Sequence, residues 1–259
     1  MYEAQREACI AAAQAGGRVA MKFFRKLDPA KVTEKSRNDL VSEADHASEA
    51  AIKAELDLRF PNYGFLGEES GASGDSCRRW IVDPLDGTLN FVQGFPHWCI
   101  SVGLWDKNGP VVGCILDPMR EDLFVAVRGQ GATWNGERIT ISAQTGLDGA
   151  FIATGFAFQL GERFQTYAKA LNSIFYRAKG IRRAGSAALD LAHVACGIYD
   201  GFFELGLRPW DMAAGVLLVQ EAGGLITDWE GGDTWMESGN VIAGNLYVHQ
   251  DLLEAVKGS

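Results

Sequence analysis

Two segments near the N-terminus show the spacing of apolar residues that is typical of amphipathic helices. Over residues 4–26 the apolar side chains recur every three or four positions, so they share one helical face. The same spacing returns over residues 43–60 and ends at Pro61, because proline cannot continue a helix. Residues 29–40 between them are charged and lack a period. We predict two helices joined by an irregular connection.

The middle of the chain is richer in strands. The run Trp80-Ile81-Val82 predicts a short buried strand, which we expect to end at Asp83 because a proline follows. Longer apolar runs predict further strands over residues 98–105, 111–116 and 123–127. The pair Asn135-Gly136 then favours a tight hairpin turn, since both residues accept positive φ angles.

The second half alternates between short apolar runs and longer amphipathic segments. A polar break at Gly146–Gly149 predicts a boundary between two halves, about 1–146 and about 147–259. The apolar runs predict strands over residues 150–154, 181–183, 201–204, 225–228 and 241–243. The amphipathic segments predict helices over residues 162–178, 187–196, 211–222 and from 247 onward. We expect one domain of mixed α/β class, with helices covering layered sheets.

Composition narrows the class of protein. Of the 259 residues, 47% are hydrophobic and 22% are charged, which excludes a disordered or fibrous chain. Acidic residues outnumber basic ones 33 to 24, and the net charge of −9 argues against general nucleic-acid binding. No stretch approaches the roughly 18 apolar residues of a membrane span. The N-terminus does not resemble a signal peptide, and five scattered cysteines without a CxxC pair predict a reducing cytoplasm.

The densest candidate chemistry is the run Asp83-Pro84-Leu85-Asp86. The two aspartates stand three residues apart across a turn, so both carboxylates can face one small volume. Pro84 has no N–H group, which would leave the Leu85 carbonyl free to face that volume as well. Carboxylate and carbonyl oxygens are hard ligands that suit Mg²⁺. An ordinary turn is the alternative, because aspartate and proline are both favoured in turns.

The next two residues add a candidate anion site. Gly87 permits close approach of a ligand, and we expect Thr88 to cap a short helix whose N–H groups would receive an anion. Two further acidic segments are candidates: the pair Glu68-Glu69 comes shortly after an apolar run, and Asp211 begins a helix. Taken alone, the first also fits a solvated loop and the second an acid that serves the helix dipole. Small residues over 213–215 would let that helix pack closely and hold Asp211 rigidly.

In combination, three segments resemble the inositol monophosphatase family: Gly67-Glu68-Glu69, Trp80-Ile81-Val82-Asp83-Pro84-Leu85-Asp86-Gly87-Thr88-Leu89-Asn90-Phe91 and Trp210-Asp211-Met212-Ala213-Ala214-Gly215. The similarity extends from Asn38 to Gly224, and residues 181–191 and 206–211 look most like the bacterial SuhB-type branch. Leu89 departs from the threonine of many members. The resemblance implies a layered αβαβα sandwich of the inositol monophosphatase and fructose-1,6-bisphosphatase type, with metals between its two halves.

Carried over by position, the resemblance implies a complete set of site residues. Two to three Mg²⁺ ions would be held by Glu68, Asp83, the Leu85 carbonyl, Asp86 and Asp211. The phosphate and the substrate would contact Gly87, Thr88, Gly185, Ser186, Ala187, Glu204 and Asp211. Asp45 matches a family position near the third metal.

The activity implied is Mg²⁺-dependent hydrolysis of inositol monophosphate by direct attack of a metal-activated water. The catalytic residues would be Glu68, Thr88 and Asp86, and lithium would inhibit. The same metal site could serve fructose 1,6-bisphosphate, histidinol phosphate or 3′-phosphoadenosine 5′-phosphate, although Asn90 and Glu204 favour the inositol branch.

The resemblance also implies partners. Members of the family form homodimers, and relatives of the SuhB-type branch bind transcription antitermination proteins. Four basic residues lie close together at Arg177, Lys179, Arg182 and Arg183. They could form a solvated face, a subunit contact or a contact with such proteins. A regulatory binding protein is therefore the second hypothesis, and it is compatible with the first.

Overall fold

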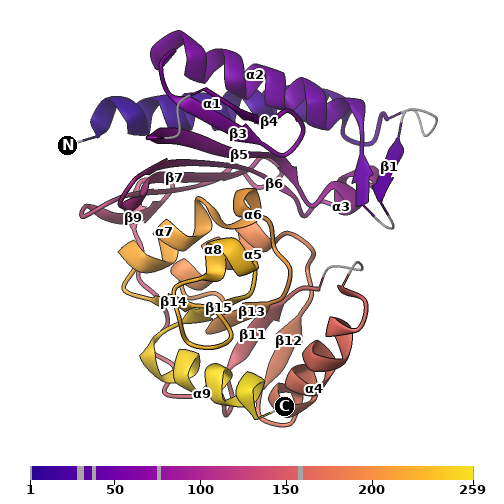
Figure 1. The fold of residues 1–259 in the computed structure, drawn as a ribbon, viewed down its shortest axis with the longest axis vertical. Coiled ribbons are helices and arrows are strands. Elements are labelled where there is room, and N and C mark those ends of the chain that lie inside the picture. The colour runs from indigo at the N-terminus through magenta and orange to yellow at the C-terminus, as the bar shows by residue number, and fades with distance from the viewer. Residues whose placement is uncertain (1, 28–31, 37–38, 75–76, 157–159, 259) are drawn as a thin grey trace.

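The computed structural model describes residues 2–27, 32–36, 39–74, 77–156 and 160–258. Helices and sheets alternate along its long axis as α-β-α-β-α layers (Figure 1). This confirms the expected layered α/β class. The division into halves at about residue 146 stays a prediction. No helix in the described ranges is long and apolar enough to cross a membrane.

The larger sheet has eight strands in the order β10-β9-β8-β7-β6-β5-β3-β4. β3 runs parallel to β5, and the other neighbours are antiparallel. Its strands are β3 Gly64–Gly67, β4 Gly71–Ser73, β5 Arg78–Asp86, β6 Cys99–Asp106, β7 Gly109–Asp117, β8 Asp122–Val127, β9 Gly131–Trp134 and β10 Glu137–Arg138. The expected hairpin turn lies between β9 and β10, where Asn135 and Gly136 both have positive φ.

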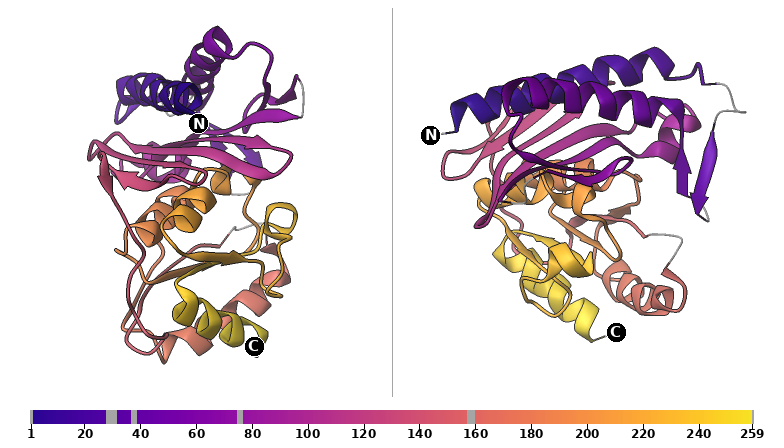
Figure 2. Two further views of the ribbon diagram at one scale, coloured as in Figure 1. Left: turned by 90° about the vertical axis from the view of Figure 1, so that its left-hand side faces the viewer. Right: turned by 45° about the horizontal axis from the view of Figure 1, so that its top comes forward.

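Two long helices cover the outer face of this sheet, α1 Glu3–Phe23 and α2 Glu43–Arg59 (Figure 2). α2 begins at Ser42, whose hydroxyl accepts a hydrogen bond from the Ala44 N–H (3.2 Å). The helix ends before Pro61, as expected. Apolar residues on both helices are fully buried against the sheet, among them Ala12 and Ile52.

The charged connection between these helices contains two strands that the sequence did not predict, and its residues 29–31 and 37–38 lie outside the described ranges. β1 Thr33–Ser36 and β2 Asp39–Val41 pair there as an antiparallel ribbon. The ribbon is held by main-chain pairing, which leaves no apolar period in the sequence. The elements β3, β4 and the short helix α8 Trp235–Ser238 were not predicted either, because three or four residues are too few to show a period.

The smaller sheet has five strands in the order β12-β11-β13-β15-β14. They are β11 Phe151–Thr154, β12 Gly180–Arg182, β13 Gly201–Glu204, β14 Leu225–Thr227 and β15 Val241–Gly244. Helices α4 Arg163–Phe175 and α9 Leu246–Lys257 cover the outer face. Between the two sheets lie α5 Ala187–Ala195, α6 Pro209–Met212 and α7 Gly215–Glu221 (Figure 1).

The helix predicted over residues 211–222 is two helices, α6 and α7, with a break at Ala213 and Ala214. The carbonyl of Ala213 accepts a hydrogen bond from the indole N–H of Trp105 on β6 (3.0 Å). Ala213 and Ala214 both keep helical backbone angles, so the chain stays helical in conformation across the interruption. The interruption lies where the helix contacts the larger sheet, a long-range contact that the sequence pattern does not contain.

Candidate metal centre

Three aspartates meet where the larger sheet contacts the middle helices. Asp83 and Asp86 come from β5 and Asp211 from α6, and one carboxylate oxygen of each lies within 4.8 Å of the others. Asp83 and Asp86 are buried, with exposed fractions of 2% and 8%. The structure therefore brings together three of the carboxylates that the sequence analysis named as metal ligands.

A bulge in β5 turns Asp83 and Asp86 to the same side. Asp83 pairs with Ser101 of β6 and Asp86 with Cys99, so two residues of β5 stand opposite one of β6. In a regular strand, residues three apart point to opposite faces, and one extra residue reverses this. The Asp83 carboxylate accepts a hydrogen bond from the Leu85 N–H (2.9 Å). The predicted strand thus continues past Asp83 and ends at Asp86.

The middle helices hold Asp86 from the other side. Its Oδ2 accepts hydrogen bonds from the Ser186 hydroxyl (2.6 Å) and from the Ala188 N–H (2.8 Å) at the start of α5. The Cys99 thiol lies 3.7 Å from the same oxygen. Burial raises the pKa of Asp86, and the hydrogen bond from Ser186 acts in the opposite direction.

Asp211 is held by the close packing of α6 on the larger sheet. Its carboxylate accepts a hydrogen bond from the Arg208 N–H (2.7 Å). Gly103 of β6 and Gly113 of β7 stand opposite each other in register. They make room for Ala213 and Ala214. The small residues after Asp211 therefore pack closely, as expected from the sequence.

The electrostatics of the cluster favour a bound cation. Burial raises the pKa of Asp83 well above its usual value, and the charges of Glu68, Asp86 and Asp211 raise it further. Burial and the charge of Asp86 raise the pKa of Asp211 in the same way. Converging carboxylates repel one another unless a proton or a cation lies between them. Because all these donors are oxygens, the residues present fit Mg²⁺.

Glu68 follows β3, next to Asp83. β3 and β5 are parallel with Gly67 opposite Val82, and the Glu68 N–H donates to the Val82 carbonyl (3.2 Å). This register places residue 68 beside residue 83, and the charge of Glu68 contributes to the raised pKa of Asp83. Glu68 is not a member of the compact group of three.

The turn after Asp86 leads into the short helix α3 Thr88–Val92. Gly87 is the residue that caps this helix, and Thr88 is its first residue, so the expectation that Thr88 caps it is wrong. Gly87 has φ 97°, and a Cβ there would lie 3.1 Å from the His97 carbonyl oxygen and 3.2 Å from that of Gly185. Only glycine suits this conformation and this close approach.

The Thr88 hydroxyl lies between two acceptors. It is 3.1 Å from the Leu85 carbonyl oxygen and 3.2 Å from Asp45 Oδ1. Asp45 is fully buried near the start of α2. The carbonyl expected to be free for a ligand therefore also contacts the threonine hydroxyl.

The remaining residues that the resemblance assigns to the substrate come from the middle layer and the smaller sheet. Gly185 and Ser186 precede α5, and Ala187 is its first residue. Glu204 ends β13 and is buried, and burial followed by the charge of Asp211 raises its pKa to about 8. A side chain on Gly155 would overlap the Glu204 carboxylate.

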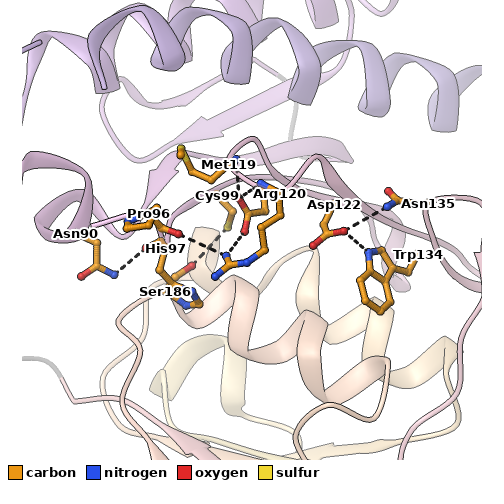
Figure 3. Close-up of polar contacts among 11 residues, drawn as sticks. Asn90, Pro96, His97, Cys99, Met119, Arg120, Asp122, Trp134, Asn135 and Ser186 are labelled. Atoms are coloured by element: carbon orange, nitrogen blue, oxygen red, sulfur yellow. Dashed lines mark hydrogen bonds and ion pairs between the residues drawn. The ribbon is translucent and has the colours of Figure 1, made fainter. Parts of the chain in front are cut away.

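Asn90 joins the two sides of the site. Its amide nitrogen contacts the His97 carbonyl (2.8 Å) and the Ala184 carbonyl (2.9 Å). Figure 3 shows Asn90 directed toward His97, with Cys99 and Ser186 nearby. From the sequence, Asn90 served only to choose among substrates, and its contacts with residues 97 and 184 were not predicted.

Three buried polar residues of α2 behind the site were also missed as a group. Asp45 and Ser48 are fully buried, and Glu49 is 4% exposed. They lie on the buried face that continues with Ile52 and Leu56. A sequence signal existed, because polar residues interrupt the apolar stripe of an amphipathic helix at these positions.

Comparison with known proteins gives a consistent picture. The model of the inositol monophosphatase family matches residues 1–258. The protein named Nus factor SuhB from Escherichia coli (strain K12) is 43% identical over 246 residues, 94% of this chain and 92% of that protein. Its namesake from Xylella fastidiosa is 41% identical over 256 residues, 96% and 93% of the two chains.

Solved structures agree with this. The extragenic suppressor protein suhB from Bartonella henselae superposes with a TM-score of 0.94 at 42% identity, covering 98% of this chain and 99% of that one. An inositol monophosphatase from Anabaena (Nostoc) sp. PCC 7120 superposes with a TM-score of 0.89 at 36% identity, covering 98% and 95%.

Proposed function

The chain belongs to the inositol monophosphatase family, and from this premise we propose that it catalyses the Mg²⁺-dependent hydrolysis of inositol monophosphate. The observation that carries the proposal is the meeting of Asp83, Asp86 and Asp211 within 4.8 Å, beside the turn at Gly87. Clustered acids and a glycine that allows close backbone approach together suit a metal and a phosphate.

Two to three Mg²⁺ ions would be held by Glu68, Asp83, the Leu85 carbonyl, Asp86 and Asp211. When bound, the ions would supply positive charge that stabilises the entering and leaving oxygens of phosphoryl transfer. The protein's part is to keep these oxygens converged. Asp86 is fixed by Ser186 and the Ala188 N–H, and Asp211 is fixed by the packing of α6.

The chain's own groups would bind the ester. The N–H groups of Gly87 and Thr88 would donate to the phosphate oxygens, since the left-handed Gly87 allows the phosphate to approach the backbone. The backbone over residues 185–187 would lie against the polyol ring. Glu204 would hydrogen-bond the hydroxyls of the polyol.

Glu68 and Thr88 would orient the attacking water. The Thr88 hydroxyl is within hydrogen-bond distance of Asp45, so it can pass its proton to that carboxylate while its oxygen accepts from water. In this proposal the water attacks the phosphorus directly, and no residue of the site forms a covalent bond to the phosphate. The leaving alkoxide would take its proton from solvent within the site.

Phosphate release from a panel of esters tests the proposal. Inositol monophosphate, fructose 1,6-bisphosphate, histidinol phosphate and 3′-phosphoadenosine 5′-phosphate would be compared with Mg²⁺ and with EDTA. We expect release from inositol monophosphate that requires Mg²⁺. Release only from another ester would overturn the substrate and preserve the reaction type.

The variant Asp86→Asn tests the metal centre. The asparagine side chain keeps an oxygen that can accept hydrogen bonds from Ser186 and Ala188, so the fold should remain. Activity should fall at least about 100-fold, because the loss of a direct metal ligand should exceed the roughly 10- to 100-fold effect of losing a residue that only supports a ligand. Asp57→Asn is the matched control, because Asp57 is an exposed residue paired with Lys53. A fully active, metal-independent Asp86→Asn protein would contradict the mechanism.

A second candidate function is binding of transcription antitermination proteins, and the relatives named Nus factor SuhB favour it. In the structure Arg177 pairs with Asp148 (2.9 Å) and Asp251 (2.7 Å). Arg182 lies over the Phe151 ring. Arg183 lies over the Phe156 ring and donates to the Phe156 carbonyl (3.3 Å), so three of the four basic residues have contacts within the chain. Capture of Nus factors and RNA polymerase, repeated with Arg183→Ala, tests this function, and no capture by the wild type would contradict it.

We also propose a cytoplasmic homodimer that lithium inhibits. Sedimentation equilibrium measures the oligomeric state, and the phosphate assay with added Li⁺ measures inhibition. Fractionation of cells that produce the tagged chain would locate it. A monomer, insensitivity to Li⁺ or recovery outside the cytoplasm would each contradict the respective statement.

A further inference from the structure

One face of α2 contacts the back of the metal centre. The helix lies over β3, β4 and β5 (Figure 1), and its buried polar residues each reach a different segment of the site. Asp45 contacts the Thr88 hydroxyl (3.2 Å), and Ser48 donates to the Pro84 carbonyl in the β5 bulge (2.8 Å). The third residue, Glu49, contacts the turn that carries Glu68.

Glu49 holds this turn by its backbone. Its Oε2 accepts a hydrogen bond from the Glu69 N–H (2.9 Å), and its Oε1 accepts one from the Ser70 N–H (2.9 Å). The carboxylate is 4% exposed, so water does not compete freely for it. Hydrogen bonds from N–H groups to a buried charged acceptor are stronger than neutral ones. Both oxygens of Glu49 are thus engaged on two consecutive N–H groups.

The chain on the other side of Glu68 is fixed as well. The Glu68 N–H donates to the Val82 carbonyl (3.2 Å). Residue 67 must be glycine, because a Cβ there would overlap the Glu49 carboxylate and lie 2.6 Å from the Phe65 ring. Three consecutive N–H groups, at residues 68, 69 and 70, are therefore anchored. The backbone on both sides of Glu68 is therefore held beside Asp83.

We propose that Glu49 is a positioning residue for the metal centre, which clamps the Glu69–Ser70 backbone and thereby directs the Glu68 carboxylate toward Asp83. The inference rests on the proposed function, because it assigns Glu68 to a bound metal. Glu49 contacts the backbone that carries a ligand, and in these contacts it does not touch the three clustered carboxylates. Such outer partners typically change metal affinity by about 10- to 100-fold when they are removed.

The variant Glu49→Gln tests this role. Glutamine keeps the length of the side chain but offers one acceptor oxygen and an NH₂ group, which would face one of the two N–H donors. The turn would then be held on one side only. We expect the dissociation constant for Mn²⁺, measured by calorimetry and electron paramagnetic resonance on metal-free protein, to rise by about 10-fold or more.

A second readout separates positioning from general damage. The Mg²⁺ concentration that gives half-maximal phosphate release should rise by a similar factor, while kcat at saturating Mg²⁺ should change less than threefold, because saturating metal restores the orientation of Glu68. If Glu49 had a merely structural role, the variant would lower the thermal midpoint in EDTA, but the folded protein would release phosphate with an unchanged dependence on Mg²⁺ concentration. Glu55→Gln is the matched control on the same helix, since Glu55 pairs at the surface with Arg59 (2.9 Å).

Glu49→Asp provides a second variant. It keeps the charge and both acceptors but draws them back from the N–H groups by one methylene. We expect the same direction of change. Values for both variants within twofold of the wild type would overturn the proposal. Failure of both to fold would overturn it too, because Glu49 would then serve the fold rather than the centre.

The two proposals fail in different ways. If the wild type binds Mn²⁺ but does not hydrolyse inositol monophosphate, the proposed function is wrong, and the Mn²⁺ measurements still decide the role of Glu49. If the wild type hydrolyses the ester with Mg²⁺ and Glu49→Gln binds Mn²⁺ as the wild type does, the proposed function stands and the clamp is wrong.

Discussion

Replacing Gly103 with alanine should disturb the metal centre through the packing of α6 and α7. Gly103 lies on β6 beneath the break between these helices. The new Cβ would stand 2.9 Å from the Ala213 carbonyl carbon and 3.0 Å from its oxygen and its Cβ. Non-bonded carbon atoms prefer about 3.5–4.0 Å. The helix must therefore retreat by about 0.5–1 Å, and Asp211 lies only two residues before Ala213.

The size of the effect follows from this displacement. Overpacking of a close-packed core costs about 1–3 kcal/mol, and the hydrogen bond from Trp105 to Ala213 (3.0 Å) contributes about 1 kcal/mol more if it breaks. Each kcal/mol lowers the thermal midpoint of a protein of this size by about 2–4 °C. A misplacement near 1 Å in a catalytic constellation costs up to about 100-fold in rate.

Calorimetry in EDTA and phosphate release as a function of Mg²⁺ concentration would measure the two effects. Gly180→Ala is a suitable control, because Gly180 lies on β12 and its nearest atoms are ring carbons of Phe151 at 3.3 and 3.4 Å. We expect Gly103→Ala to lower both the thermal midpoint and the activity, and the control to change neither strongly. A lower midpoint with unchanged Mg²⁺ dependence and rate would refute the reasoning, since the position of Asp211 would then not depend on this packing.

Two further predictions concern the charge of Glu204 and the contacts of Asn90. Burial raises the pKa of Glu204 from 4.5 to about 8, so the folded metal-free protein holds a proton that the unfolded chain releases, and its stability should fall as the pH rises through this window. The change from 4.5 to about 8 corresponds to about 5 kcal/mol. Unfolding in EDTA at several pH values would be compared for the wild type and for Glu204→Gln, which removes this titration. A stability difference that does not depend on pH would contradict the prediction. Asn90→Ala should lower the free energy of unfolding in urea by about 1–3 kcal/mol, because the carbonyls of His97 and Ala184 lose their donor. A loss below about 0.5 kcal/mol, the usual range of surface changes, would show that the amide does not stabilise the contact between these two segments.

The elements that bury one face were predictable from the sequence alone. Helices α1 and α2 and strands β6, β7 and β8 follow the expected ranges closely, because burial imposes a period near 3.6 on a helix and strand-length apolar runs on a buried sheet. The ribbon β1–β2 and the break in the helix after Asp211 were not predictable. The ribbon is held by main-chain pairing of two short strands, and the break lies at a contact with Trp105 of β6; neither leaves an apolar pattern in the local sequence.

For the candidate site, the sequence supplied the chemistry but not the arrangement. The spacing of Asp83 and Asp86 indicated oxygen ligands, and the neighbouring glycine indicated room for a phosphate. The resemblance to a family then assigned Glu68 and Asp211 to the same metal site. The bulge in β5 decides that both aspartates face one side, and it depends on pairing with β6. The expected cap at Thr88 was wrong because the left-handed Gly87 takes that place.

Sequence by itself therefore determined the layered α/β class and the kinds of side chain available to a metal and a phosphate. These are local properties, since burial periodicity and ligand type can be recognised within a few neighbouring residues. Tertiary structure decided which carboxylates converge, how Asn90 contacts Ala184 and why Glu49 is buried behind Glu68. Hydrogen bonds and close packing between residues far apart in the chain produce that arrangement. A short stretch of sequence does not contain both partners of such a contact.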